Sequence, residues 1–455
     1  MSLLHPSSTT TSEPDSIPDP NYQLSHLENG LSVATFPMSW LHEISVTILV
    51  RAGSRFESEN ESGIAHFLEH MLFKGTTNTP DPTQFHALIE SMAADMNAAT
   101  GHESNAYWIS LPLELLQPGL SAFCEMFTQP VFSDMETERE VILAEMRDEE
   151  NEQGECTNTS VLSGGKLWPN HPLARSILGS PEQINTLTKA HLYDYMKRQY
   201  RGGNMAIAFC GPIQHDYSLK LAAENLGQLP SGRTALPPGP ADMEPGPHWV
   251  AVNDQDAQFC LNIFYRTGGY HHSDYYRIAA LRRLLDDGFS SRLQANIREK
   301  QGLVYDVWAS YTAFLECGCF ELGGSVSPKN LDHLFDGLLN EMEKAAQTTP
   351  TVSEWQRLQT RWRASLLTQL DRPSQLIDRY VGDRLFDYQE PLSLAWEKAR
   401  SIRPETLATT VRSLINAENM VVVLIGPKAT STLPRLKRLF QKKVHSKSQT
   451  KVPTL

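Results

Sequence analysis

Two histidines and a glutamate stand close together in the chain, at His66, Glu69 and His70. In a helix, positions four residues apart lie on the same face, so both imidazoles can reach one metal ion. Glu69 lies near that face, where it can carry a proton for a water that the metal activates rather than bind the metal itself. The spacing therefore predicts a metal site on one helix.

A catalytic zinc site with the pattern H-x-x-E-H needs a third protein ligand. Ser133 and Glu136 form a capping-box signature that predicts a helix start. Glu138 and Glu145 follow at a spacing of two helical turns, so both carboxylates share a face. Glu145 can be the third ligand and Glu138 can orient a histidine or a water. In so charged a helix, a glutamate is otherwise solvated surface, and the choice of Glu145 rests on the resemblance given below.

The composition is that of a water-soluble globular chain. The 455 residues, 40% of them hydrophobic and 20% charged, are enough for two or three domains. The net charge of -13 argues against a nucleic-acid partner. The six cysteines form no CxxC pair, which favours a reducing compartment and makes a disulfide framework unnecessary.

The two ends of the chain are predicted to be loose. Residues 1–20 are rich in Ser, Thr and Pro and carry no Lys or Arg, which indicates a disordered tail rather than a secretory signal or a transit peptide. Residues 441–455 are predicted to be a basic tail. No apolar run of about 18 residues exists, so no membrane span is expected. A cytoplasmic location of bacterial type fits these features best.

The chain repeats itself at a fixed offset. In the strand that precedes Arg51-Ala-Gly53, apolar residues alternate with mostly polar ones, and the same pattern precedes Arg266-Thr-Gly268, 215 positions later (268 minus 53). Asn204-Met205 leads to Gly211-Pro212, and Asn419-Met420 leads to Gly426-Pro427 at the same offset. The sequence therefore predicts an internal duplication.

Each half is predicted to be one α+β unit, a mainly antiparallel sheet packed with helices. We expect an N-terminal domain over residues 21–232, a Pro-rich linker over 233–247 and a C-terminal domain over 248–440. At an offset of 215, the positions of His66, Glu69 and His70 become Leu281, Leu284 and Leu285. The fold alone thus does not require the three polar side chains, and a buried His-Glu-His group without a metal would be costly.

Several motifs together resemble the pitrilysin family of zinc peptidases, the inverzincins, and especially its shorter branch, which includes the β subunit of the mitochondrial processing peptidase. The resemblance covers nearly all of the chain beyond the N-terminal tail. The motifs are His66-Phe-Leu-Glu-His70 through Lys74-Gly-Thr76, Asn97-Ala-Ala-Thr100, Glu138 to Glu145, His171-Pro-Leu173, Ile177-Leu-Gly179, Phe289-Ser-Ser-Arg292-Leu293 and Arg298 to Tyr305.

The resemblance implies a role for each matching site residue. It implies that His66, His70 and Glu145 bind one zinc ion per chain and that Glu69 is the general base. Glu138 matches an acidic residue with a supporting role near the metal.

Substrate contacts are implied as well. The segment Met96, Asn97 and Ala98 matches an edge strand on which a peptide lies extended. Arg298 and Tyr305 match a pair that holds the substrate and polarises its carbonyl from the half facing the zinc. Because this chain supplies only one half of such a chamber, the resemblance implies a homodimer, or a heterodimer with a zinc-free homologue.

The expected function is that of a zinc endopeptidase that cleaves short or unfolded peptides, a precursor or leader peptide among them. The alternative is a non-catalytic structural or chaperone-like subunit of a peptidase heterodimer. No Gly-rich substrate loop of the processing-peptidase α partner is found, and no matrix-targeting signature, which favours a bacterial-type peptidase. No nucleic-acid or membrane partner is expected.

Overall fold

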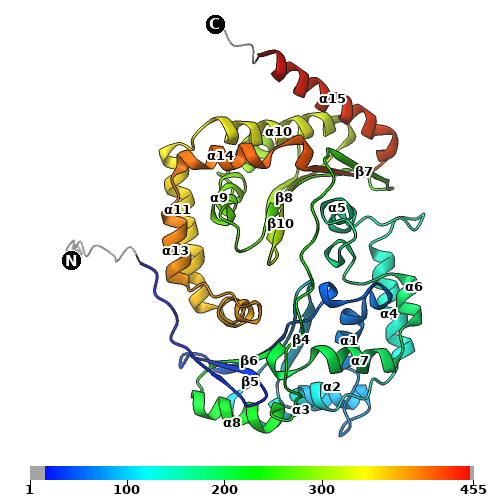
Figure 1. Ribbon diagram of the computed structural model, residues 1–455, viewed down its shortest axis with the longest axis vertical. Coiled ribbons are helices and arrows are strands. Elements are labelled where there is room, and N and C mark those ends of the chain that lie inside the picture. The colour runs from blue at the N-terminus through cyan, green and yellow to red at the C-terminus, as the bar shows by residue number, and fades with distance from the viewer. Residues whose placement is uncertain (1–15, 451–455) are drawn as a thin grey trace, which may run out of the picture.

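The computed structural model describes residues 16–450, with side-chain surroundings through residue 445 (Figure 1). The strands are β1 (Gln23–His26), β2 (Ser32–Pro37), β3 (Glu43–Val50), β4 (Asp95–Thr100), β5 (Asn105–Pro112), β6 (Met205–Gly211), β7 (His248–Asn253), β8 (Phe259–Gly268), β9 (Asp306–Ala313), β10 (Cys317–Val326) and β11 (Met420–Gly426). The helices are α1 (Ile64–Leu72), α2 (Pro82–Ser91), α3 (Leu116–Thr128), α4 (Met135–Asp148), α5 (Thr159–Leu167), α6 (Pro181–Thr186), α7 (Lys189–Gln199), α8 (His215–Leu226), α9 (Tyr275–Leu285), α10 (Leu331–Gln347), α11 (Val352–Leu367), α12 (Pro373–Ile377), α13 (Leu392–Arg400), α14 (Pro404–Leu414) and α15 (Ala429–Thr450).

The strands form two sheets of matching topology. The first has the order β1-β2-β6-β3-β5-β4 and the second has the order β7-β11-β8-β10-β9. Only β2 with β6 and β7 with β11 pair in parallel, and all other neighbours are antiparallel. The predicted α+β fold with two mainly antiparallel, helix-packed halves is therefore confirmed.

Alternation along the strands explains how each sheet packs. In β3, Ile44, Val46, Ile48 and Val50 all point into one core, where they meet apolar residues of α1, α3, α7 and α8. The equivalent strand β8 buries Phe259, Leu261, Ile263 and Tyr265 against α9, α10 and α14. The three leucines of α9 at the positions of the His-Glu-His group, Leu281, Leu284 and Leu285, are buried in the same core, as expected for a helix kept without its polar residues.

The other face of each sheet is covered by a helix from the opposite half. Helix α5 of the N-terminal half packs on β11 and β8 of the second sheet (Figure 1). There Leu167 and Trp168 meet Phe264, Val421 and Val423. In the C-terminal half, α12 and the π-helical turn after it, Asp378–Gly382, pack on β3 and β6. There Ile377 and Tyr380 meet Leu49 and Ala206 in one continuous hydrophobic core. The two halves therefore share their cores.

Arginines from both halves bind the Pro-rich segment between α8 and β7. Arg51 donates to the carbonyl of Thr234, and Arg55 donates to the carbonyl of Pro237 at 3.1 Å. The equivalent of Arg51 in the second half, Arg266, donates to the carbonyls of Pro240 and Ala241 at 3.2 and 2.6 Å. The segment thus lies fixed along both halves, although no helix or strand forms in it.

Both ends are more ordered than expected within the described residues. Residues 1–15 lie outside them, but Ile17 is only 1% exposed and Asp19 accepts hydrogen bonds from the Tyr380 hydroxyl and the Ser393 amide. At the other end, α15 continues through residue 450 instead of ending near 440. The basic residue Lys443 lies 3.7 Å from Glu343 of α10, which explains why this charged segment stays on the protein. Residues 451–455 also lie outside the described part.

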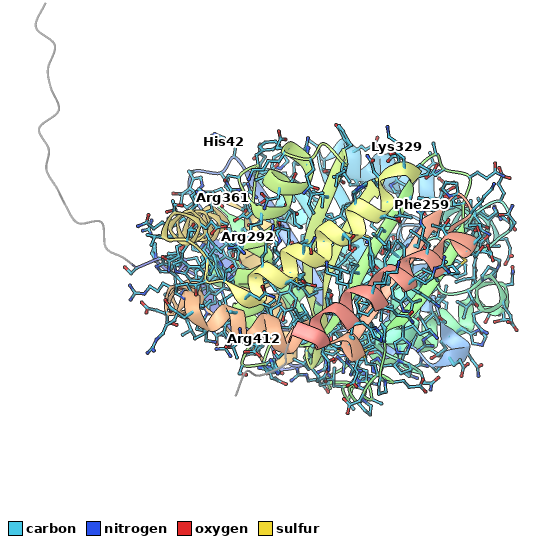
Figure 2. The ribbon with its side chains drawn as sticks, turned by 90° about the horizontal axis from the view of Figure 1, so that it is seen from above. His42, Phe259, Arg292, Lys329, Arg361 and Arg412 are labelled. Carbon is cyan, nitrogen blue, oxygen red and sulfur yellow. The ribbon has the colours of Figure 1, made fainter. Side chains whose placement is uncertain are left out.

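Seen from above, α10 and α15 cross one face of the molecule next to each other (Figure 2). Between residues 16 and 450, no helix combines the length and apolar character that crossing a membrane requires. All six cysteines are free thiols, and Cys317 and Cys319 lie buried in β10.

Candidate metal centre

Helix α1 presents the H-x-x-E-H residues from an otherwise buried element. Ile64, Phe67, Leu68 and Met71 face the core and fix the helix, while the polar residues emerge on the opposite side. The rings of His66 and His70 lie 4.6 Å apart between centroids, as expected for residues four apart in a helix.

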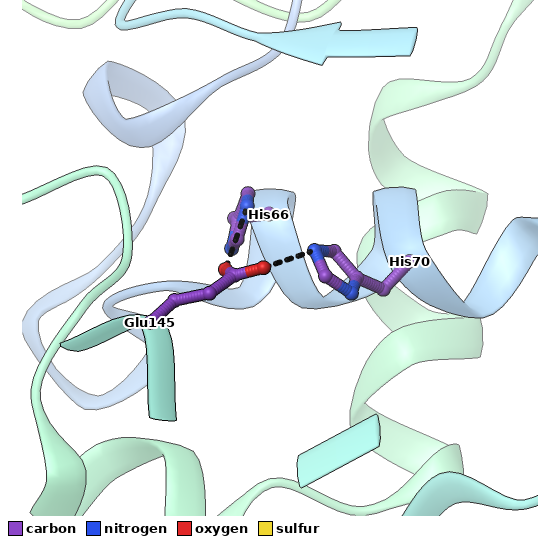
Figure 3. A group of neighbouring side chains, drawn as sticks. All are labelled: His66, His70 and Glu145. Atoms are coloured by element: carbon purple, nitrogen blue, oxygen red, sulfur yellow. Dashed lines mark ion pairs between the residues drawn. The ribbon is translucent and has the colours of Figure 1, made fainter. Parts of the chain in front are cut away.

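Glu145 of α4 reaches both histidines (Figure 3). Its Oε2 lies 3.8 Å from His66 Nε2 and its Oε1 lies 3.7 Å from His70 Nε2. One ligand atom from each residue falls within 4.8 Å of the others, and among the residues that the structure describes no further group of this kind is found. Donors bound to one tetrahedral zinc at about 2.1 Å lie about 3.4 Å apart, so a small closing movement would seat the ion.

The surroundings of His66 suit a metal ligand. Burial, and secondarily the neighbouring His70, lowers the pKa of His66 to about 4, which keeps its imidazole neutral as a ligand must be. His66 Nδ1 is buried without a hydrogen-bond partner in the described part of the chain, and Nε2 is the nitrogen that faces Glu145. Two imidazoles and one carboxylate are a donor set that fits zinc.

Glu138 holds the His70 ring at Nδ1, the nitrogen other than the one that faces Glu145. Its Oε2 accepts a hydrogen bond from His70 Nδ1 at 3.1 Å, and its Oε1 lies 2.5 Å from the Lys74 ammonium. This contact leaves His70 Nε2 as the nitrogen available to a metal. Glu138 is only 7% exposed, because α4 turns it toward α1.

The start of α4 differs from the expectation. The helix begins at Met135, and the Ser133 hydroxyl donates to the carbonyl of Pro80 at 2.9 Å rather than capping the helix. Glu136 pairs with Arg139 instead of completing a capping box. The predicted capping box is therefore wrong, although the two-turn spacing of Glu138 and Glu145 places both carboxylates at the histidines as the sequence indicated.

Glu69 lies next to the metal-binding group in a polar setting. The Thr100 hydroxyl donates to Glu69 Oε2 at 2.5 Å. Burial raises the pKa of Glu69 above its ordinary value, and the hydrogen bond from Thr100 acts in the opposite direction. His66, Glu69 and Thr100 line a cavity of about 550 Å³ that Phe264, Thr312 and Phe314 of the other half close from the far side. His66 and Glu69 therefore face a space between the two halves.

The proposed substrate strand is an open edge. Among the strands of residues 16–450, β4 pairs only with β5, so none of them occupies its second edge, and Met96, Asn97 and Ala98 lie at its centre. Asn97 is exposed, and its side chain accepts a hydrogen bond from the Ala98 amide. An edge of this kind can pair with an extended peptide.

Arg298 and Tyr305 lie apart from this cavity and are not among its lining residues. Arg298 belongs to the π-helical turn Gln294–Glu299, and its guanidinium lies 5.6 Å from the ring centroids of both Tyr305 and Phe289. Tyr305 is 83% exposed and Phe289 is 74% exposed. The single chain thus does not bring this pair to its own metal-binding group.

Two polar residues near Glu69 were missed from the sequence as functional candidates. Thr100 ends the motif Asn97-Ala-Ala-Thr100, and Asn105 starts the next strand, where its amide donates to the Thr100 hydroxyl at 2.9 Å. Asn105 is completely buried. A fully polar residue at the first position of an otherwise apolar strand is the signal that could have identified it.

Comparison with known families agrees with this geometry. The family described as "Insulinase (Peptidase family M16)" matches residues 39–180, which contain His66, Glu69, His70, Glu138 and Glu145. The family described as "Peptidase M16 inactive domain" matches residues 186–361. The chain belongs to the M16 peptidases, the pitrilysin-type family that its motifs indicated.

Relatives and solved structures cover most of the chain. An uncharacterized zinc protease of Rickettsia felis is 28% identical over 76% of this chain and 83% of its own length. An uncharacterized zinc protease of Mycobacterium tuberculosis is 26% identical over 90% and 94%. The mouse mitochondrial-processing peptidase subunit beta is 26% identical over 90% and 85%. A protease from Helicobacter pylori has the same fold, with a TM-score of 0.81 at 20% identity over 90% of this chain and all of its own.

Proposed function

We propose that this protein is a zinc-dependent endopeptidase that cleaves short or unfolded peptides. The observation that carries the proposal is the group of His66, His70 and Glu145, whose donor atoms lie within reach of one metal ion. Of this group His66, together with the neighbouring Glu69, lines a cavity between the halves. The similarity to proteins named zinc protease supports the same choice of metal.

In this proposal His66 Nε2, His70 Nε2 and Glu145 hold one zinc ion per chain. The ion, when bound, lowers the pKa of a water and polarises the peptide carbonyl. Glu69 takes the proton that the attacking water loses and delivers it to the departing amine, which balances the hydrolysis. Glu138 holds the His70 ring in place through Nδ1.

The substrate pairs with the free edge of β4 in the proposed complex. Backbone hydrogen bonds from Met96 to Ala98 would accept many sequences, because pairing of this kind uses no side-chain identity. A folded protein rarely offers an unpaired extended segment, so the edge selects unfolded chains. The lining of the cavity by residues of both halves supports an enclosed site.

Arg298 and Tyr305 serve the zinc of a second subunit in this proposal. Their distance from the cavity of their own chain and the 83% exposure of Tyr305 support a role at a surface that another subunit completes. Because one chain carries both sets of residues, a homodimer with two composite sites suffices. A heterodimer with a zinc-free homologue is the other arrangement.

A peptide-library digest tests the activity. The wild type is expected to bind one zinc per chain and to cleave peptides, while Glu69→Gln keeps the zinc and loses cleavage. A zinc-loaded wild type that cleaves no member of the library would refute the peptidase and favour the non-catalytic subunit, in line with the inactive-domain description of residues 186–361.

Subunit mixing tests the composite site. A His66→Ala chain and an Arg298→Ala chain are each expected to be inactive alone. Mixed in equal amounts with free exchange, half of the dimers are mixed and each holds one intact site, so about a quarter of the wild-type activity should return. Mixed dimers that form, as shown by differently tagged chains, without any return of activity would contradict the arrangement.

A further inference from the structure

A short chain of hydrogen bonds leads from the core to Glu69. The Asn105 amide nitrogen donates to the Thr100 hydroxyl at 2.9 Å, and the Thr100 hydroxyl lies 2.5 Å from Glu69 Oε2. The same amide nitrogen lies 3.4 Å from the carbonyl of Ala65, which can only accept, so the donor faces this way. Since Thr100 already accepts from Asn105, its single proton points to Glu69.

The second half of the protein shows that the fold does not need this series of hydrogen-bonded side chains. Asn105 pairs with Val50 in β3, and its equivalent in the second sheet, opposite Tyr265, is Phe320. Across the next pair of strands, Thr100 lies opposite Asn105, and Tyr311 lies opposite Phe320.

Glu69 corresponds to Leu284 at the offset of 215. The second half thus replaces the entire polar chain by Leu284, Tyr311 and Phe320, with Phe320 completely buried. Asn105 is a buried polar side chain at a sheet position that an aromatic ring fills equally well, which calls for a reason other than packing.

We propose that Thr100, held by Asn105, is a positioning residue for Glu69, an inference that rests on the proposed peptidase function. The Thr100 hydroxyl donates a hydrogen bond to Glu69 Oε2 and thereby fixes the rotamer of the Glu69 carboxylate. Oε1, which has no hydrogen bond among the described residues, is then the oxygen that exchanges the proton with water and amine. Without the hydroxyl, the carboxylate would rotate and spend less time in the reactive orientation.

The location of Thr100 adds a link to the substrate. It is the last residue of β4, two positions after Ala98, and side chains two apart in a strand point to the same side. The hydroxyl that holds Glu69 therefore lies at the end of the strand with which an extended peptide would pair.

Three variants isolate the hydroxyl. Thr100→Val keeps the shape and removes the donor, Thr100→Ser keeps the donor, and Thr47→Val makes the same exchange in β3 of the same sheet. We expect Thr100→Val to lower kcat about 10- to 100-fold with KM and zinc content unchanged, as for loss of one hydrogen bond to a charged group. Thr100→Ser should lie within about threefold of the wild type, and Thr47→Val should match it.

A binding measurement separates positioning from substrate contact. In an inactive Glu69→Gln background, the dissociation constant of a fluorescent peptide should be the same with Thr100 or Val at this position. A change in that constant, a loss of zinc, or a fall of Thr100→Ser to the level of Thr100→Val would overturn the inference, because the residue would then act on the substrate, the metal or the packing.

The result for the wild type keeps this inference distinct from the function on which it rests. A zinc-loaded wild type without peptide cleavage refutes the peptidase and the inference together. A wild type that cleaves, with Thr100→Val equally active, refutes the positioning role alone.

Discussion

The carboxylate of Glu138 offers a quantitative test of the metal centre. It accepts from His70 Nδ1 at 3.1 Å and lies 2.5 Å from the Lys74 ammonium, in a setting where it is only 7% exposed. Glu138→Gln keeps the size of the side chain and an oxygen acceptor but removes the negative charge. The change weakens the hydrogen bond to the His70 ring and removes the ion pair with Lys74.

The magnitude follows from the contact that is weakened. A hydrogen bond to a charged group contributes about 1.5–3 kcal/mol and a neutral one about 0.5–1.5 kcal/mol, so the exchange removes about 1–1.5 kcal/mol from the support of His70. That corresponds to an approximately tenfold weaker zinc affinity. Glu138→Ala also removes the acceptor, and we expect a loss of about a hundredfold, at the upper end for residues that orient metal ligands.

Competition with a chromophoric zinc chelator at neutral pH measures this effect. Glu140→Gln is the matched control, because Glu140 lies on the exposed side of the same helix and carries the same charge. Its zinc affinity should equal that of the wild type. If Glu138→Gln bound zinc as tightly as Glu140→Gln, the hydrogen bond to His70 would have no part in holding the metal, and the reasoning would fail.

Three further variants test the surroundings of the site. Burial lowers the pKa of His102 to about 4, so stability is lost as the pH falls from about 6.5 toward 4, by about 2 kcal/mol between pH 7.5 and 5. Urea titrations should show that His102→Asn loses less stability than the wild type between these pH values, by this amount. An equal loss in the wild type and the variant would argue against this role of His102. Arg55→Met breaks buried ion pairs and should lower the unfolding free energy by about 3 kcal/mol, whereas the exposed Arg198→Met should change it by less than about 1 kcal/mol. Gly179→Ala places a Cβ 2.4 Å from the Ser62 carbonyl at a positive φ and should lower the melting temperature by several degrees, and an unchanged melting curve would contradict the contact.

Sequence patterns predicted much of the fold because the duplication repeats its local signals. Alternation in β3 and β8 and the shared offset of 215 gave two equivalent sheets, and the leucines of α9 marked the half without a metal group. Periodicity describes which face of an element is apolar but not which distant element covers it. For that reason the exchange of α5 and α12 between the halves could not be predicted.

The candidate metal ligands show the same contrast between what local spacing predicts and what only packing decides. The spacing of His66 and His70 within one helix fixes their common direction, and this much was legible in the sequence. Glu145 joins them only through the packing of α4 on α1, and its selection needed the resemblance to a family. The hydroxyl of Thr100 became visible as a partner of Glu69 only once the strand register was known.

The helices that cover the inner faces of the sheets are themselves equivalent. α5 spans Thr159–Leu167, and the same offset of 215 leads to residues 374–382, which are α12 and the π-helical turn after it. Each half therefore gives the other the same structural element. The two halves thus exchange equivalent helices within one polypeptide, as two subunits do in a domain-swapped dimer.

Because of this exchange, each half depends on the other to cover one face of its sheet. Either half made alone would expose the apolar sheet face that its companion's helix covers, and a second copy of the same half could cover it in the same way. A half-length protein of this architecture would thus be a swapped dimer, and the Pro-rich segment held by Arg51 and Arg266 turns that pairing into a permanent covalent one.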